Sequence, residues 1–319
     1  MDWLFILIGL VLLFAGGEAS LRGAIGLSKR LGVSPAIIGL TVVGFGTSAP
    51  ELVVTVQAAL ANQHGLAMGN VVGSNISNLL LILGVGAMIY PLVCAPEALR
   101  RDGTMMLGAM VLLVILAQTG EIVAWQGALM LATLIAYISW SYYCDKKNSK
   151  TSDLHEREGE EIENVPENTF IVLLYIIIGL ICLVGGAHLL VDGAVNIAQS
   201  FNIPESIIGL TIVALGTSLP ELAATAVAAA RRHTDVAIAN IIGSCLFNVL
   251  SILGITAMIK TIKISPDIQN IDIWVMLAAA IVLIPLLLKD RKLCRLDASV
   301  LLAAYVTYFI SLAWRMDYI

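Results

Sequence analysis

The chain has 319 residues, of which 59% are hydrophobic and only 13% are charged, with a mean hydropathy of +0.92. This composition is typical of a polytopic membrane protein and excludes a soluble domain with one anchor. The net charge is −5, and no basic patch of the kind that binds nucleic acid occurs. We therefore expect the lipid bilayer as a partner, with no nucleic acid and no obligate protein partner. The five cysteines form no Cys-x-x-Cys motif, and we interpret them as free thiols.

Apolar segments follow one another along the chain and predict an all-α membrane protein with ten transmembrane helices. The expected spans are 3–27, 36–60, 66–89, 103–118, 122–143, 169–197, 206–230, 236–258, 272–288 and 297–314. The only sizeable polar segment, 145–168, holds eight acidic and four basic residues and is typical of a solvated linker. It separates a first membrane repeat, 1–144, from a second, 169–319.

The second expected span contains a sequence that interrupts a helix. Its segment 46–51 reads Gly-Thr-Ser-Ala-Pro-Glu inside an otherwise apolar run. Pro50 has no N–H and crowds the carbonyl one turn before it, so we expect the helix to break here. Irregular backbone at membrane depth is tolerated where it lines a polar cavity, and a carboxylate such as Glu51 marks an ion or substrate path by default. The hydroxyls of Thr47 and Ser48 complete a set of oxygen donors that suits a hard cation.

The same sequence occurs again in the second half. Residues 209–254 repeat residues 39–84 at a constant offset of 170, without gaps, and 22 of the 46 positions are identical. The identities keep the whole polar set: Gly46/Gly216, Thr47/Thr217, Ser48/Ser218, Pro50/Pro220, Glu51/Glu221, Asn70/Asn240, Gly73/Gly243, Ser74/Ser244 and Asn78/Asn248. Paired interrupted helices in two matching halves indicate the binding site of a transporter.

Five spans per half is an odd number, so the second repeat must enter the membrane upside down. The positive-inside rule tests this inversion, because cytoplasmic loops collect Lys and Arg. With both termini outside, 15 of the 18 basic residues face the cytoplasm, and only Lys260, Lys263 and Arg315 lie outside. We therefore predict inverted repeats in the cell membrane, with outside termini and a cytoplasmic, acidic 145–168 linker.

Inverted repeats place Glu51 and Glu221 near the membrane midplane, across a pseudo-two-fold axis. Calcium takes six to eight oxygens from carboxylates, carbonyls and amides. The two carboxylates, the carbonyls near Thr47 and Thr217, and the amide oxygens of Asn78 and Asn248 are expected to form such a cage. Ser74 and Asn78 are four residues apart and therefore share one helix face.

Other interpretations remain open for these residues. The carboxylate pair can serve only to hold helices together, and small or amide residues also serve plain helix packing in membranes. Glu18 and Arg22, like His188 and Asp192, are four residues apart and are interpreted as local pairs near helix ends. The chain has no His-Glu-x-x-His or Gly-x-Ser-x-Gly motif, so we expect neither an enzyme nor a cofactor.

Two copies of Gly-Thr-Ser-x-Pro-Glu, each followed by Gly-Ser-x-x-x-Asn, resemble the calcium/cation antiporter superfamily, in particular its prokaryotic sodium/calcium exchanger branch. The resemblance covers the chain outside the 145–168 linker. It implies that Glu51 and Glu221 bind calcium and also sodium, helped by oxygens of Thr47 and Thr217. It further implies flanking sodium sites completed by Ser48, Ser218, Ser74, Ser244 and the carbonyls near Gly44 and Ala214.

Asn78 matches the family's asparagine, whereas at Asn248 several relatives carry aspartate. This departure affects the expected stoichiometry and potassium dependence but not the reaction class. The resemblance implies an antiporter that exchanges sodium for calcium by alternating access. The alternative is a proton-driven calcium or cation exchanger that uses the same glutamate pair.

Overall fold

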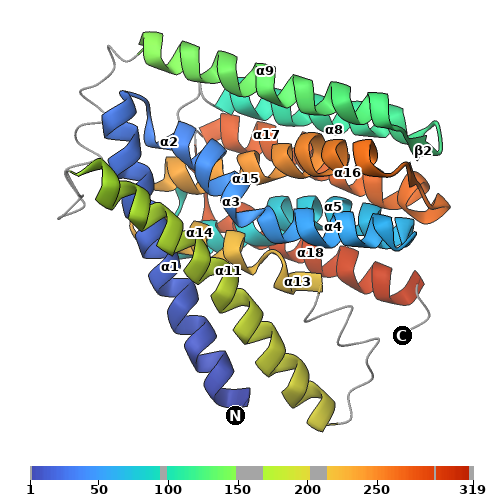
Figure 1. The fold of residues 1–319 in the computed structure, drawn as a ribbon, viewed down its shortest axis with the longest axis horizontal. Helices are drawn as coiled ribbons and strands as arrows, with labels where there is room; N and C mark the ends of the chain where they lie inside the picture. The colour runs from blue at the N-terminus through green and yellow to red at the C-terminus, as the bar shows by residue number, and fades with distance from the viewer. Residues whose placement is uncertain (1, 94–98, 149–167, 202–213, 291, 316–319) are drawn as a thin grey trace.

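The computed structural model describes residues 2–93, 99–148, 168–201, 214–290 and 292–315, and these residues form an almost entirely helical bundle (Figure 1). Several spans contain π-helical segments, which are labelled η. The helices are α1 (Asp2–Leu31), α2 (Pro35–Ile38), η1 (Gly39–Val43), α3 (Gly44–Thr47), α4 (Ala49–Leu60), α5 (His64–Ile76), η2 (Ser77–Ile82), α6 (Leu83–Ile89), η3 (Leu99–Gly103), α8 (Thr104–Ala117), α9 (Ala124–Asn148), α11 (Thr169–Ser200), α13 (Ala214–Gly216), α14 (Leu219–Ala230), α15 (Thr234–Leu246), η6 (Phe247–Ile252), α16 (Leu253–Ile259), η7 (Ile268–Asp272), α17 (Ile273–Asp290) and α18 (Arg295–Arg315).

Four two-residue strands close the ends of the bundle. They are β1 (Leu92–Val93), β2 (Glu121–Ile122), β3 (Ile262–Lys263) and β4 (Lys292–Leu293). β1 pairs with β4 and β2 pairs with β3, both antiparallel. Each pair therefore joins one strand from each half of the chain.

The two longest helices, α1 and α11, lie side by side and project from one side of the bundle (Figure 1). Glycines allow their backbones to approach closely. A Cβ atom at Gly9 would lie 2.7 Å from the carbonyl oxygen of Gly186, and one at Gly16 would lie 2.7 Å from that of Gly179. Small residues at helix contacts are typical of membrane bundles, where close packing rather than the hydrophobic effect drives association.

The opposite part of the bundle surrounds the run Thr234–Ile259, whose most apolar window is wholly buried. This run comprises α15, η6 and α16. α15 packs against η1 and α3 from the first half of the chain, while α16 packs against α9. The centre of the bundle is therefore built from both halves.

Within the described residues, seven helices are long and apolar enough to cross a membrane, and a bent pair, Pro35–Thr47 with Ala49–Leu60, brings the number to eight. η3 and α8 form one continuous helix from Leu99 to Ala117, which is not among these seven. Residues 206–213 of the expected span 206–230 lie outside the described residues, and α13 and α14 form its remainder. The count of ten spans stays a prediction.

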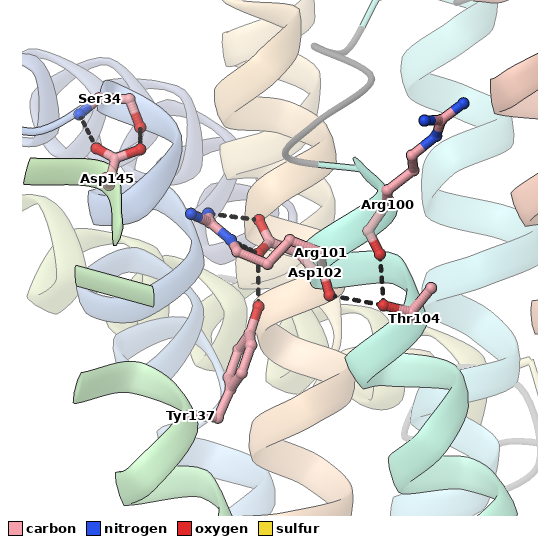
Figure 2. Close-up of polar contacts among 7 residues, drawn as sticks. All are labelled: Ser34, Arg100, Arg101, Asp102, Thr104, Tyr137 and Asp145. Carbon is pink, nitrogen blue, oxygen red and sulfur yellow. Dashed lines mark hydrogen bonds and ion pairs between the residues drawn. The ribbon is translucent and has the colours of Figure 1, made fainter. Parts of the chain in front are cut away.

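The end of α9 differs from the expected linker. The helix runs on to Asn148, three residues past the predicted linker start at Asp145. The Asp145 carboxylate accepts hydrogen bonds from the backbone N–H of Ser34, at 2.6 Å, and from its hydroxyl, at 3.2 Å (Figure 2). Since Ser34 precedes the first turn of α2, Asp145 ties the end of the first repeat to the start of its broken helix. Residues 149–167 of the linker lie outside the described residues.

A buried aspartate precedes α8 in the first half of the chain, and another precedes α17 in the second half. Asp102 binds the Arg101 guanidinium at 2.6 Å and accepts a hydrogen bond from the hydroxyl of Tyr137 on α9 (Figure 2). Asp272, at the repeat-equivalent position, accepts from Tyr308 at 3.2 Å and from Arg315 at 2.6 Å. The carboxylates are thus paired and hydrogen-bonded, as buried charges require.

Candidate functional site

The helix of the second span breaks at Ser48, between α3 and α4, with a bend of 43°. Ser48 has φ −84° and ψ 6°, outside helical geometry, and Pro50 lies in the first turn of α4. A proline is tolerated there because that position has no helical partner for an N–H. Glu51 also lies in this first turn, where the positive end of the helix dipole favours a carboxylate.

The second half repeats this geometry. α13 ends at Gly216, Ser218 has φ −90° and ψ 3°, and α14 begins at Leu219 with Pro220 in its first turn. Glu221 therefore takes the position on α14 that Glu51 takes on α4. The backbone break predicted from the two motifs occurs at the same residue of each.

The two carboxylates lie in one buried region and are close enough to repel each other electrostatically. Glu51 and Glu221 are each only 1% exposed. The Ser48 hydroxyl donates to Glu221 Oε1 at 2.9 Å, and Ser218 lies against the Glu51 carboxylate. The Oε2 atoms of both glutamates are buried without a hydrogen-bond partner among the described residues. Burial of such an oxygen costs free energy unless a cation or a hydrogen-bond donor binds it.

The third expected span, 66–89, and its repeat equivalent, 236–258, each contribute one asparagine amide next to the broken helices. Asn78 and Asn248 are the second residues of η2 and η6, and both side chains are almost completely buried. η2 packs against α14 and η6 against α4, so each amide segment faces the broken helix of the other half. The amide nitrogen and oxygen of both residues lack a partner within the described part of the chain. π-helical turns are frequent at functional sites because they re-aim side chains within a helix.

Gly44, Thr47 and Ser244 form a third group of oxygens. The Ser244 hydroxyl lies 3.4 Å from the carbonyl oxygen of Gly44 and 3.5 Å from the Thr47 hydroxyl. The Thr47 hydroxyl also lies 3.3 Å from the Gly44 carbonyl. A Cβ atom at Gly44 would lie 3.2 Å from the backbone nitrogen of Ser244, so glycine permits this close approach of α3 and α15.

The remaining predicted residues occupy less defined positions. Ser74 is buried on α5, four residues before Asn78. Because the π-helical segment η2 begins between them at Ser77, their common helix face stays a prediction. Thr217 is half-buried, and its hydroxyl has no partner among the described residues. Ala214 is the first residue of α13, and its side chain lies outside the described atoms.

Two asparagines of the repeated polar set, Asn70 and Asn240, make contacts beside the site that the sequence analysis did not predict. The Asn70 amide donates to the Thr55 hydroxyl at 2.9 Å and to the Glu51 backbone carbonyl at 3.3 Å. Asn240 donates to Thr225 at 3.1 Å in the second half. These bonds fix the broken helices against α5 and α15. Their identity in the two repeats was the signal available in the sequence.

A buried thiol was also missed. Cys245, on α15, lies near the Asn78 amide and within electrostatic range of Glu221. Its repeat equivalent is Asn75, whose amide donates to the Val71 carbonyl of its own helix at 2.7 Å. The motif comparison alone gave no reason to place this cysteine beside the carboxylates.

The chemistry of the site is that of oxygen donors. Within the described residues, no group of three or more His, Cys, Asp or Glu side chains converges as a metal-binding cluster. The site instead combines two carboxylates with hydroxyl, amide and backbone oxygens, which are the ligands that hard cations prefer.

Comparison with known proteins places the chain in a family. The family model described as "Sodium/calcium exchanger protein" matches residues 1–143 and 171–314. A putative antiporter, CaxA, from Alkalimonas amylolytica is 35% identical over 96% of both chains, and the sodium/calcium exchanger MaX1 from Methanosarcina acetivorans is 29% identical over 98% of both. The solved structure of the sodium-calcium exchanger NCX_Mj superposes with a TM-score of 0.84 at 29% identity, again covering 98% of both chains.

The fold and the oxygen-lined site between its halves define a secondary transporter of cations rather than an enzyme. The chain belongs to the sodium/calcium exchanger family. It is a multi-pass membrane protein of the calcium/cation antiporter class.

Proposed function

We propose that this protein exchanges sodium for calcium across the cell membrane by alternating access, with Glu51 and Glu221 as the central ion ligands. One observation carries the proposal. Two buried carboxylates from opposite halves share one region, and each keeps an oxygen without a partner among the described residues. A cation bound between them would satisfy both oxygens.

Charge balance explains why such a site would exchange ions rather than leak them. Two ionised glutamates carry −2, which one calcium ion or a set of sodium ions neutralises. An empty, dehydrated pair of carboxylates is strongly unfavourable, because the low-dielectric interior cannot replace their hydration. The protein therefore changes between its two access states only with ions bound at the site. Net transport of one kind of ion in one direction requires transport of the other kind in the opposite direction.

We assign supporting roles to the residues around the pair. Thr47 and Thr217 supply backbone or hydroxyl oxygens to calcium, and the Asn78 and Asn248 amides complete its cage. The flanking sodium sites take oxygens from Ser48, Ser218, Ser74, Ser244 and the carbonyls near Gly44 and Ala214. The positions of Gly44, Thr47 and Ser244, whose oxygens lie within 3.5 Å of one another, support this assignment.

We further propose that the chain consists of two inverted membrane repeats, 1–144 and 169–319, joined by a cytoplasmic linker, with ten spans and both termini outside. The division of basic residues supports the orientation. Repeated contacts support the internal symmetry. Asn70–Thr55 and Asn240–Thr225 are the same bond in the two halves, and strands β1 and β3, which are repeat equivalents, pair with β4 and β2.

Alternating access would follow from movement of α1 and α11. These helices pack closely on each other along their glycines. Figure 1 shows them on one side of the bundle, next to the helices that carry the site. We infer that the pair slides against the rest of the bundle and exposes the carboxylates to one side at a time.

Calcium flux into proteoliposomes tests the counter-ion. The reconstituted protein receives either an outward sodium gradient or an outward proton gradient, with an ionophore to clamp the voltage. Sodium-driven exchange predicts calcium uptake that requires the sodium gradient. Uptake driven by the proton gradient alone would instead support the alternative, a proton-driven exchanger that uses the same glutamates.

A further inference from the structure

An ion pair joins α1 to the end of α14, outside the candidate ion site. Arg231, immediately after α14, donates from Nε to Glu18 Oε2 at 2.8 Å. The other carboxylate oxygen, Glu18 Oε1, is bound at 2.8 Å by Arg22, one turn along α1. The side chain of Glu18 is 16% exposed, whereas that of Arg231 is 48% exposed. One acidic side chain on α1 therefore bridges two arginines, one of which belongs to the site-bearing part of the bundle.

The helices below this bridge are in direct contact. A Cβ atom at Gly17 would lie 2.8 Å from Cγ2 of Val227, so α1 rests on α14 without a gap. A nearby cavity between α1, α14 and α15 has a volume of about 10 Å³ and is lined in part by Gly17, Ser20 and Asn240. That volume holds about one water molecule. At this contact, the described residues of α1 and α14 leave space for about one water molecule.

The other half of the chain lacks this bridge. The repeat equivalents of Glu18 and Arg231 are His188 and Ala61. Alanine cannot form an ion pair, and His188 is exposed on α11. Within the described residues, α11 also makes no packing with α4 comparable to that of α1 with α14. The internal repeat thus provides a natural comparison in which only one of two equivalent helix contacts is closed by charge.

We propose that Glu18 and Arg231 form a lock that holds α1 against α14 and favours the state closed on the Arg231 side. Glu18 is a positioning residue here, because it acts through α1 and does not touch the transported ions. The proposal rests on the alternating access proposed above. The absence of an equivalent pair at His188 and Ala61 makes the two access states unequal in free energy, so the exchanger rests open toward the Ala61 side.

A ligand or contact shifts a two-state equilibrium only by its difference in free energy between the states. The bridge exists in the closed state and breaks when α1 leaves α14. A partly buried, charge-assisted contact of this kind makes a difference of roughly fivefold to tenfold in the population of the open state.

Cysteine labelling on the Arg231 side tests the lock. Ala228→Cys, which lines the small cavity, reports opening between α1 and α14 when modified by a membrane-impermeant thiol reagent, in a background without the native cysteines. We expect Glu18→Gln and Arg231→Ala to raise the modification rate about fivefold to tenfold. Arg231→Lys should keep most of the closed state, because it retains the charge.

Arg232→Ala is the matched control. Arg232 is the next residue and carries the same charge, but its guanidinium lies over the ring of Tyr90 rather than on Glu18. Equal labelling rates in the Arg231→Ala, Arg232→Ala and parent proteins would overturn the proposal. Labelling needs no ion gradient, so this failure is distinct from a failure of sodium/calcium exchange. Thermal unfolding of each variant separates opening of the lock from loss of the fold.

The repeat also offers a reciprocal variant. His188→Glu combined with Ala61→Arg builds the missing pair on the opposite side. We expect this double variant to raise Ala228→Cys labelling from the Arg231 side, since it stabilises the alternative state. An unchanged rate, in a protein with parent-like thermal stability, would count against charge as the element that sets the balance.

Discussion

Ser48, on the broken helix of the first half, donates a hydrogen bond of 2.9 Å to Glu221 on the broken helix of the second half. The bond links the two motifs through the carboxylate that we assign to ion binding. A hydroxyl that donates to an ionised carboxylate stabilises its charge without neutralising it. The two halves therefore share their polar groups across the site instead of forming separate ones.

Removal of this bond should weaken ion binding. Hydrogen bonds to charged groups contribute about 1.5–3 kcal/mol, so Ser48→Ala is expected to lower the apparent calcium affinity about tenfold or more. The calcium dependence of uptake into proteoliposomes measures the effect. Ser28→Ala is the control, because the buried Ser28 hydroxyl donates at 2.8 Å to the Ile25 carbonyl of its own helix. Equal affinities in the two variants would mean that the Ser48 hydroxyl has no part in ion binding.

Substitution of Asn248 should change the pH dependence of exchange. Asn248→Asp adds a third titratable carboxyl group to a site whose fixed charge otherwise comes from Glu51 and Glu221. A protonated aspartate resembles asparagine in shape and charge, so exchange at acidic pH should be close to that of the parent. Toward neutral pH the aspartate ionises and changes the net charge of the site, and the rates should diverge.

Sodium-dependent calcium flux across a pH series measures this difference between the parent and Asn248→Asp. Superimposable profiles would show that position 248 does not face the ions. The π-helical position of Asn248 and the absence of a described partner for its amide are the structural reasons to expect an effect.

Inversion of the repeats predicts opposite accessibility at equivalent positions. Arg30 and Ser200 occupy the ends of α1 and α11, are separated by the repeat offset of 170 and are both exposed. We expect a cysteine at Arg30 to be labelled from the cytoplasm and one at Ser200 from outside. The measurement uses an impermeant reagent on oriented vesicles from a cysteine-free background. Labelling of both positions from the same side would contradict the inverted topology.

Close packing between the halves should depend on Gly243. A Cβ atom there would lie 2.8 Å from the backbone carbon atoms of Leu40, which cannot move without shifting η1. We expect Gly243→Ala to destabilise the protein by about 1–3 kcal/mol, a typical effect of overpacking. Gly108→Ala, where the added Cβ would meet no described heavy atom within 4 Å, should leave stability unchanged or slightly higher. Thermal unfolding in detergent compares the two; similar losses would contradict this account of the contact.

The sequence predicted the elements of the site that recur in both halves. The two Pro-Glu motifs located the helix breaks because proline removes a fixed hydrogen bond, and this is a local property. Such features are set within a few residues of the chain, and a duplicated motif doubles the signal.

Contacts between distant segments were not accessible from the sequence in the same way. The pairing of Glu18 with Arg22 was predicted from their spacing, but Arg231 joins the same carboxylate from 213 residues away. The placement of Asp145 in a polar linker was wrong in detail, because α9 continues and the carboxylate binds Ser34. Both differences have one cause, because tertiary partners decide which charged residues are solvated.

The most direct test of the account compares single charge-neutralised variants at the two glutamates. Glu51→Gln and Glu221→Gln keep the shape of the side chain but halve the negative charge of the site. We expect each to abolish calcium uptake driven by a sodium gradient in proteoliposomes, while thermal unfolding and membrane insertion stay close to those of the parent. Uptake at the parent rate by both variants would contradict the assignment of Glu51 and Glu221 as the ligands of the exchanged ions.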